Sequence, residues 1–160
     1  MVWGCFCGNH QGTFVPLVVR SVNALIYRQL LKLLLLPVID HINRTIGNAK
    51  FQQDNAPVHT VKVIQHLLKR HHIAVERHPP YSSDLNPIEH VWIHLKRYLQ
   101  AKYPDIANTP GGPDAVHSRL AEVLPEVWEV ISESVFESLW WSMPNRVATV
   151  ISAKGWYTQY

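Results

Sequence analysis

Two carboxylates stand out because of where each falls in its local pattern. Asp54 follows the short apolar stretch 49–53, and Glu89 comes soon after Pro87, at the start of a helical pattern. They are separated by 89 − 54 − 1 = 34 residues. Two acids at the ends of such elements can share a hard divalent cation, which phosphoryl-transfer enzymes use. The pair therefore indicates metal-dependent chemistry on a phosphate ester, for which a third acid is usually required.

Each acid also has a plain local explanation. Composition alone favours an Asp54 that is a solvated turn residue, capping the next helix. Glu89 is the third residue after Asn86, which is the spacing of a capping box. A structural α/β module without any nucleic-acid role therefore stays open as an alternative.

The hydrophobic pattern predicts an α/β fold with a helical C-terminal tail. We expect a hairpin with Pro16 at an edge, a long helix kinked or broken at Pro37, and a helix that starts near Pro57. The expected strands are 1–7, 13–19, 49–53 and 73–77, and the expected helices are 25–46, one from 57, one from 87, 115–139 with an interruption near Pro125, and 144–153.

The charge balance permits contact with nucleic acid without establishing it. The formal net charge is +3 and the sequence pI is about 9.0. The candidate DNA-contacting residues lie around Glu89 in the sequence: Arg77, Lys96, Arg97 and Lys102. Four tail tryptophans are expected to pack in the core rather than to stack on bases: Trp128, Trp140, Trp141 and Trp156.

Other features point away from a secreted or membrane protein. Cys5 and Cys7 are too close for an ordinary disulfide, lack a second pair for a zinc site, and are expected to be buried thiols. The apolar stretch 30–38 is too short to span a bilayer, so we expect a buried helix and no membrane association.

Two longer motifs add a family resemblance. The sequences QDNAPVHT around Asp54 and PPYSSDLNPIEHVW around Glu89 resemble the second and third catalytic blocks of the mariner superfamily of transposases. Their spacing is similar to that of the Tc1-like branch, whose triad is Asp, Asp and Glu. The segments VWGCF, PLV and SMP, the later Lys154-Gly155 and the final Tyr160 also resemble family landmarks, in the same order along nearly the whole chain.

The resemblance implies a ribonuclease-H-like domain over residues 1–160, with a mixed sheet flanked by helices. It implies that Asp54 and Glu89 are the second and third metal-binding acids, that Mg²⁺ or Mn²⁺ is the cofactor, and that DNA is the substrate. His59 could orient neighbouring groups or be structural, and we expect Asp84 to be a loop or cap residue. The full-length parent is expected to act as a homodimer, in the nucleus of a eukaryote or otherwise in the cytoplasm.

The sequence departs from the family at its first acid. That Asp belongs on a central strand upstream of Met1, and Asp40 follows a helix and is unsuited to replace it. We therefore expect a truncated catalytic domain that is inactive alone and binds the cation weakly or not at all. Either the strand 1–7 closes against 49–54, or the chain is poorly stable. A non-enzymatic relic that binds nucleic acid or a partner is the alternative.

Overall fold

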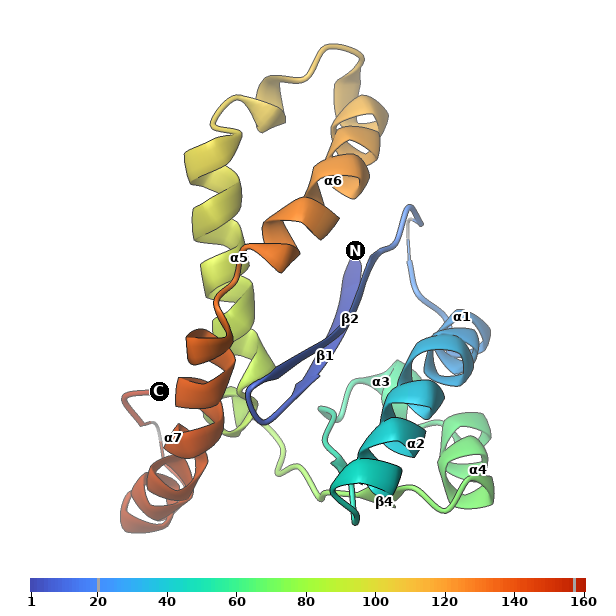
Figure 1. Ribbon diagram of the computed structural model, residues 1–160, viewed down its shortest axis with the longest axis vertical. Helices are drawn as coiled ribbons and strands as arrows, with labels where there is room; N and C mark the ends of the chain where they lie inside the picture. The colour runs from blue at the N-terminus through green and yellow to red at the C-terminus, as the bar shows by residue number, and fades with distance from the viewer. Residues whose placement is uncertain (20, 157) are drawn as a thin grey trace.

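The computed structural model describes residues 1–19, 21–156 and 158–160, and it combines short strands with long helices (Figure 1). The elements run, in chain order, β1 (Val2–Cys7), β2 (His10–Pro16), α1 (Ala24–Leu30), η1 (Leu31–Leu35), α2 (Leu36–Thr45), β3 (Lys50–Phe51), α3 (Pro57–Thr60), α4 (Lys62–Arg70), β4 (Ala74–Val75), η2 (Ser83–Leu85), α5 (Ile88–Lys102), η3 (Ile106–Asn108), α6 (Gly112–Glu129) and α7 (Glu133–Ser152). The predicted α/β class is confirmed.

The β1–β2 hairpin lies between two packed halves of the molecule (Figure 1). Its strands are antiparallel, with Val2 opposite Pro16 and Cys7 opposite His10. Successive side chains of a strand point to opposite faces. Accordingly Trp3 packs against one hydrophobic cluster, whereas Val2 and Phe6 pack against the other. The hairpin thus joins the two halves through its own alternation.

The first half is built on the helical segment from α1 to α2 together with α4. Its core residues share an aliphatic or aromatic character and near-complete burial: Tyr27, Leu31, Leu35, Ile39, Ile64, Leu67, Leu68 and Ile73. The parallel pair β3–β4 lies beside this core, with Lys50 opposite Ala74 and Phe51 opposite Val75. This half carries Asp54, which follows β3.

The second half is built on α5, α6 and α7. Its core contains Val91, Leu95, Leu124, Val127, Trp128, Ile131, Phe136 and Leu139. Trp128 is 1% exposed and stacks on Phe14 of β2, with ring centroids 4.8 Å apart and planes inclined by 15°. This half carries Glu89, the second residue of α5.

The two small sheets do not join. Among the described residues β1 pairs only with β2, and β3 pairs only with β4. Of the two alternatives, the one in which strand 1–7 closes against 49–54 is therefore wrong, because the free edges of β1 and β3 form no ladder with one another. Backbone groups along an unpaired strand edge must be satisfied by water or by another strand. The low stability expected in this case stays a prediction.

Three prolines of this chain lie within helical segments and do not mark where the helices end. The helical segment continues from α1 to α2 past Pro37. The preceding η1 is a π-helical turn, in which the Leu36 N–H donates to the Leu31 carbonyl, and it accommodates the proline. Pro125 and Pro144 likewise lie inside α6 and α7. Both are exposed, so water can hydrate the carbonyls they leave unpaired. The break expected near Pro125 actually falls after Glu129.

The helix expected from Pro57 is divided instead at Val61, whose backbone is extended (φ −66°, ψ 149°). Thr60 ends α3 and its hydroxyl donates back to the Ala56 and Pro57 carbonyls, which replaces helical backbone donors there. The sequence predicts an apolar stripe of Val61, Ile64, Leu67 and Leu68 for this helix. The last three are buried in α4 as predicted, whereas Val61 is 37% exposed and the prediction is wrong there. The division leaves α3 as a separate turn next to Asp54.

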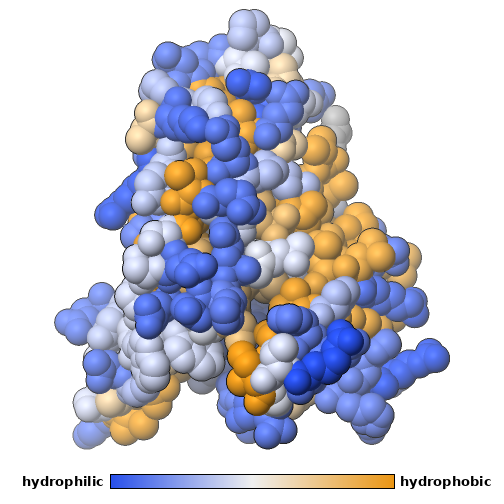
Figure 2. All heavy atoms as spheres, viewed as in Figure 1, coloured by the Kyte–Doolittle hydropathy of each residue, from blue (hydrophilic) through white to orange (hydrophobic). Residues whose placement is uncertain are grey.

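The surface holds several exposed apolar side chains. Trp128 is buried as predicted, but Trp140, Trp141 and Trp156 are 49%, 68% and 74% exposed, so the core prediction is wrong for these three. Figure 2 shows hydrophobic surface extending toward the side where α1 lies, and the exposed Val18, Val19 and Leu25 belong to that part of the chain. Among the helices within the described residues, none is both long and apolar enough to cross a bilayer.

We predict that Gly4→Val destabilises the hairpin junction. A Cβ at Gly4 would lie 3.0 Å from Trp92 Cη2 and 3.3 Å from Phe14 Cδ2, so a larger side chain must displace packed rings. Overpacking of this kind costs about 1–3 kcal/mol. Urea unfolding measures the loss, and His10→Val, at an exposed position of the same hairpin, is the control. Equal stability of the two variants would contradict the packing described here.

Candidate functional site

Asp54 lies just beyond β3 with one carboxylate oxygen held and the other free. Its Oδ1 accepts hydrogen bonds from the Ala56 N–H at 3.0 Å and from His59 Nδ1 at 2.5 Å. No described residue donates to Oδ2. The Asp54 side chain is 47% exposed, so Oδ2 is accessible to a ligand.

A group of side chains around the buried Tyr27 supports this orientation. A carboxylate can only accept hydrogen bonds, so Nδ1 of His59 carries the proton in this contact. The His59 ring lies against Tyr27, with centroids 4.3 Å apart. The Tyr27 hydroxyl donates to Gln53 Oε1 at 2.7 Å, and Gln53 Nε2 donates to the His59 carbonyl at 3.4 Å. The structure thus favours the orienting role that the sequence left open for His59.

Glu89 projects from the first turn of α5. Its Oε1 accepts a long hydrogen bond, 3.5 Å, from the Asn86 side-chain amide. The backbone N–H of Asn86 is used elsewhere, by the Ser83 carbonyl. The reciprocal backbone contacts of a capping box are therefore not made, and capping does not account for the Glu89 carboxylate.

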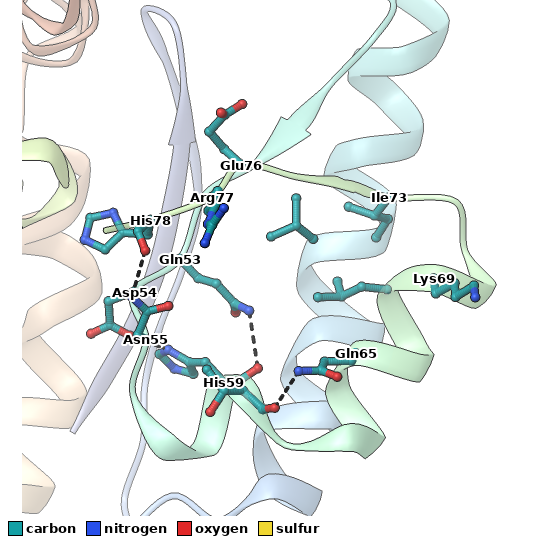
Figure 3. Close-up of a pocket in the computed structure, with 13 residues that line it drawn as sticks. Gln53, Asp54, Asn55, His59, Gln65, Lys69, Ile73, Glu76, Arg77 and His78 are labelled. Atoms are coloured by element: carbon teal, nitrogen blue, oxygen red, sulfur yellow. Dashed lines mark hydrogen bonds and ion pairs between the residues drawn. The ribbon is translucent and has the colours of Figure 1, made fainter. Parts of the chain in front are cut away.

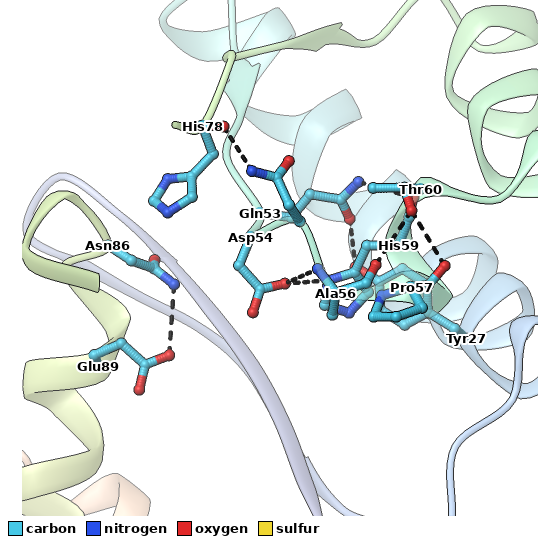
Figure 4. Close-up of polar contacts among 11 residues, drawn as sticks. Tyr27, Gln53, Asp54, Ala56, Pro57, His59, Thr60, His78, Asn86 and Glu89 are labelled. Atoms are coloured by element: carbon cyan, nitrogen blue, oxygen red, sulfur yellow. Dashed lines mark hydrogen bonds and ion pairs between the residues drawn. The ribbon is translucent and has the colours of Figure 1, made fainter. Parts of the chain in front are cut away.

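The two carboxylates face the same space. Figure 4 shows Asp54 and Glu89 on opposite sides of one gap, each with its carboxylate turned toward it. Glu89 is exposed as a residue, but partial burial of its carboxyl raises its pKa above the ordinary 4.5, and the negative charge of Asp54 raises the pKa further. Lys96, two turns along α5, opposes the rise. The acids are therefore close enough to repel one another.

Side-chain amides connect the segments that carry the two acids. Gln52 Nε2 donates to the Leu85 carbonyl at 2.5 Å and lies 3.3 Å from His78 Nδ1. Asn55 Nδ2 donates to the His78 carbonyl at 2.7 Å. Residues on either side of Asp54 are thus tied to the loop that leads to Glu89.

A buried arginine holds the same loop from α7. Arg146 is 2% exposed, and its Nη1 donates to the Asp84 carbonyl and to His90 Nε2, both at 2.8 Å. Burial, then the adjacent Arg146 charge, lowers the pKa of His90, so the neutral ring can offer Nε2 as an acceptor. Asp84 itself accepts from the Leu85 N–H and from the Thr158 hydroxyl, as expected of a loop residue.

Each acid borders its own hollow. A cavity of about 420 Å³ is lined by Asp54, His59, Lys69, Arg77 and His78 among others (Figure 3). A second, of about 560 Å³, is lined by Glu89, Trp92, Lys96 and Tyr160 among others. One candidate DNA-contacting basic residue therefore lines each hollow: Arg77 in the hollow beside Asp54, and Lys96 in the hollow beside Glu89.

The other two basic residues line neither of these hollows. Arg97 is exposed on α5. Lys102 ends α5, 13 residues beyond Glu89 and roughly 20 Å along the helix at 1.5 Å per residue. It forms an ion pair with Glu126 and does not flank Glu89. Arg77 and Lys96 are consequently the better placed of the four.

Hard divalent cations bind carboxylate oxygens, and Mg²⁺ is usually held by one or two carboxylates while it keeps several waters. The pair Asp54 and Glu89 fits that donor set, with Asp54 Oδ2 free. Within the described residues no group of three or more His, Cys, Asp or Glu side chains is arranged to hold a metal ion. Within the part of the chain that the structure describes, Asp54 and Glu89 are therefore the candidate ligands.

Comparison with known proteins identifies the family. Residues 4–109 match the family described as DDE superfamily endonuclease. The chain belongs to this family. It is 36% identical over 163 residues to the transposable element Tcb2 transposase of Caenorhabditis briggsae, and 33% identical over 166 residues to the Tc1 transposase of Caenorhabditis elegans. Each alignment covers all of this chain and 54% of the relative, so the chain spans about half the length of these relatives.

Solved structures support the predicted fold. The Mos1 transposase catalytic domain with raltegravir and Mn is similar with a TM-score of 0.66 and 21% identity, over 88% of this chain and 67% of that chain. The Mos1 mariner paired end complex with Mn gives 0.65 and 22%, over 87% and 38%. The resemblance to the mariner superfamily and the ribonuclease-H-like fold are confirmed.

Sequence reasoning missed Gln52 and Arg146. Gln52 stands two positions before Asp54, where an extended chain places both side chains on one face, and this signal could have drawn attention to it. Arg146 lies 62 positions from Asp84 and gives no local signal of their contact. Tyr27 lies in the helix expected over 25–46, and its hydrogen bond with Gln53 gives no signal in the sequence.

We predict that the pKa of Glu89 responds in opposite directions to two neutralising substitutions. Asp54→Asn removes a negative neighbour and should lower it, whereas Lys96→Gln removes a positive one and should raise it. Carbon-13 NMR titration of the glutamate carboxyls measures both shifts. Lys62→Gln, an exposed lysine on α4, is the control. A Glu89 pKa that is unmoved in Asp54→Asn would show that the carboxylates are not coupled.

The same shift has a consequence for stability. The folded pKa of Glu89 is above the unfolded value, so its contribution to stability is fully present below the unfolded pKa and is lost as pH rises through the folded pKa. Glu89→Gln should therefore lose less stability than wild type as the pH rises above the ordinary glutamate pKa of 4.5. Parallel pH–stability curves for the two proteins would contradict this.

Proposed function

We propose that Asp54 and Glu89 supply two of the carboxylates of a metal-dependent site that cuts and joins DNA during transposition. The observation that carries the proposal is the pair itself: two carboxylates from separate halves of the molecule face one gap and repel one another. Membership of the DDE superfamily endonuclease family and the transposase names of the matched relatives support it.

The proposed cofactor is Mg²⁺ or Mn²⁺. Such a cation activates an attacking water or 3′-hydroxyl and stabilises the leaving oxygen of the phosphodiester. The Asp54 Oδ2 and the Glu89 carboxylate would hold it, since hard oxygen donors suit it. His59 and the Ala56 N–H hold Asp54 Oδ1 and so keep Oδ2 directed at the gap. Asn86 restrains Glu89 from the other side.

DNA is the proposed partner, with Arg77 and Lys96, which line the two hollows, as its first basic contacts and Arg97 and Lys102 as further ones. Neutralised phosphates would add attraction that weakens as salt rises. Assembly with a second copy in a longer parent, and a nuclear location in a eukaryotic source or a cytoplasmic one otherwise, are part of the same proposal.

We predict that these 160 residues by themselves do not cleave DNA. Two carboxylates leave part of the transition-state charge without stabilisation, which is worth several kcal/mol in metal-assisted reactions. A supercoiled-plasmid nicking assay with Mn²⁺ should give no more product than Glu89→Gln gives. Robust nicking that Glu89→Gln abolishes would refute the inactivity.

The same samples separate the catalytic proposal from a binding relic. DNA binding that falls steeply with salt, without metal binding at Asp54 and Glu89, would favour a non-enzymatic relic. The basic residues beside both hollows make this the second candidate. Absence of DNA binding at low salt would remove it.

We also predict that His59→Ala weakens the affinity for Mn²⁺ by about 10- to 100-fold, the usual effect of losing a residue that orients a metal ligand. His59 holds Asp54 Oδ1, so its loss lets the carboxylate rotate. Electron paramagnetic resonance of free Mn²⁺ measures the affinity. His66→Ala, at an exposed position of α4, is the control. Equal Mn²⁺ affinities in His59→Ala and His66→Ala would contradict the orienting role of His59.

A further inference from the structure

The short turn η2, which precedes α5, accepts hydrogen bonds at two of its backbone carbonyls from side chains of two different segments. The Leu85 carbonyl accepts from Gln52 Nε2 at 2.5 Å, and the Asp84 carbonyl accepts from Arg146 Nη1 at 2.8 Å. These acceptors are consecutive residues, and the donors come from the two different halves of the molecule. The turn therefore has little freedom to shift toward or away from either half.

The contact that Gln52 makes with η2 comes from the same segment of the chain that carries Asp54. Gln52 stands two residues before Asp54, and both belong to the segment that leaves β3. Its amide reaches across 33 positions of sequence to Leu85, and it lies 3.3 Å from His78 Nδ1. This hydrogen bond therefore directly connects the Asp54 segment with the turn that precedes Glu89.

The Arg146 side fixes the start of the Glu89 helix. The Arg146 Nη1 that reaches Asp84 also donates to His90, the residue after Glu89, and its Nε donates to the Ser142 hydroxyl at 2.7 Å. Its guanidinium lies 4.6 Å from the centroid of the Tyr160 ring. One buried side chain thus contacts both η2, five residues before Glu89, and α5 at the residue after Glu89.

We propose that Gln52 and Arg146 are positioning residues that set the place of the Glu89 carboxylate relative to Asp54. The inference rests on the proposed function, in which these two acids share a divalent cation. Neither residue touches the cation in this account. Each acts through the turn, and each is held by contacts of its own that leave few alternative positions.

Small displacements matter here because cation–oxygen distances tolerate only a few tenths of an ångström. Glu89 has one weak hydrogen bond of its own, from Asn86 at 3.5 Å, so it cannot hold its position unaided. Loss of a residue that orients a metal ligand typically costs 10- to 100-fold in affinity.

Two substitutions, each with a matched control, test the contacts of Gln52 and Arg146 with η2. Gln52→Met keeps the length of the side chain and removes the amide donor, and Gln100→Met makes the same exchange at an exposed site on α5. Arg146→Lys keeps the charge and cannot reproduce the planar fork that serves several acceptors. Arg70→Lys, exposed at the end of α4, is its control. Circular dichroism first establishes that each variant is folded.

Two measurements are then made on the folded proteins. Mn²⁺ affinity reports the metal site, and amide hydrogen exchange at Leu85 and Asn86 reports the turn without requiring any metal. We expect Gln52→Met and Arg146→Lys each to weaken Mn²⁺ binding by about tenfold or more. We expect exchange at the turn to accelerate roughly 2- to 10-fold, as for the loss of one net hydrogen bond. The two controls should match wild type in both measurements.

The outcomes separate the two proposals. Wild-type Mn²⁺ affinity in both Gln52→Met and Arg146→Lys would overturn the positioning role and leave the metal site standing. Unchanged amide hydrogen exchange at Leu85 and Asn86 would contradict the restraint of η2 by Gln52 and Arg146. A wild-type protein that binds no Mn²⁺ would overturn the proposed function, and the positioning role with it.

Discussion

The separation of Asp54 and Glu89 depends on contacts between two independently packed halves. Each acid is attached to its own hydrophobic cluster, one around α4 and the other around α5. The β1–β2 hairpin contributes side chains to both clusters, and the Gln52–Leu85 hydrogen bond crosses between the segments that carry the acids. A change in the packing of either half therefore acts on the gap between the carboxylates.

The arrangement also has an electrostatic cost. Ionised Glu89 raises the free energy of the folded chain, because partial burial and then the nearby Asp54 charge disfavour its charged form. Lys96 offsets part of this repulsion, and a divalent cation would offset more. Groups kept in an unfavourable arrangement by the rest of a structure are common at functional sites. The pairing is accordingly easier to understand as a binding arrangement than as a stabilising one.

Local signals accounted for much of the fold. Asn23 caps α1 by accepting from the Leu25 and Ile26 N–H groups, and the buried positions of α4 follow the apolar stripe in the sequence. Proline was misleading at Pro125 because burial of neighbours such as Val127 carries the helix past it. A single-residue rule cannot weigh that distant packing.

The site was only partly visible in the sequence. Motif context drew attention to Asp54 and Glu89, but the side chains that hold them come from remote parts of the chain. Tyr27 and Gln52 approach from one half and Arg146 from the other. Their roles depend on tertiary contacts that no periodicity records, and the separation of Lys102 from Glu89 likewise required the helix to be seen at full length.

The most direct measurement is a double-mutant cycle of Mn²⁺ affinity on Asp54→Asn, Glu89→Gln and the variant that combines both. If the two carboxylates share one cation, each single substitution should remove most of the binding and the combined variant should lose little more. Two single variants that each bind Mn²⁺ as wild type does, or losses that simply add, would contradict a shared cation.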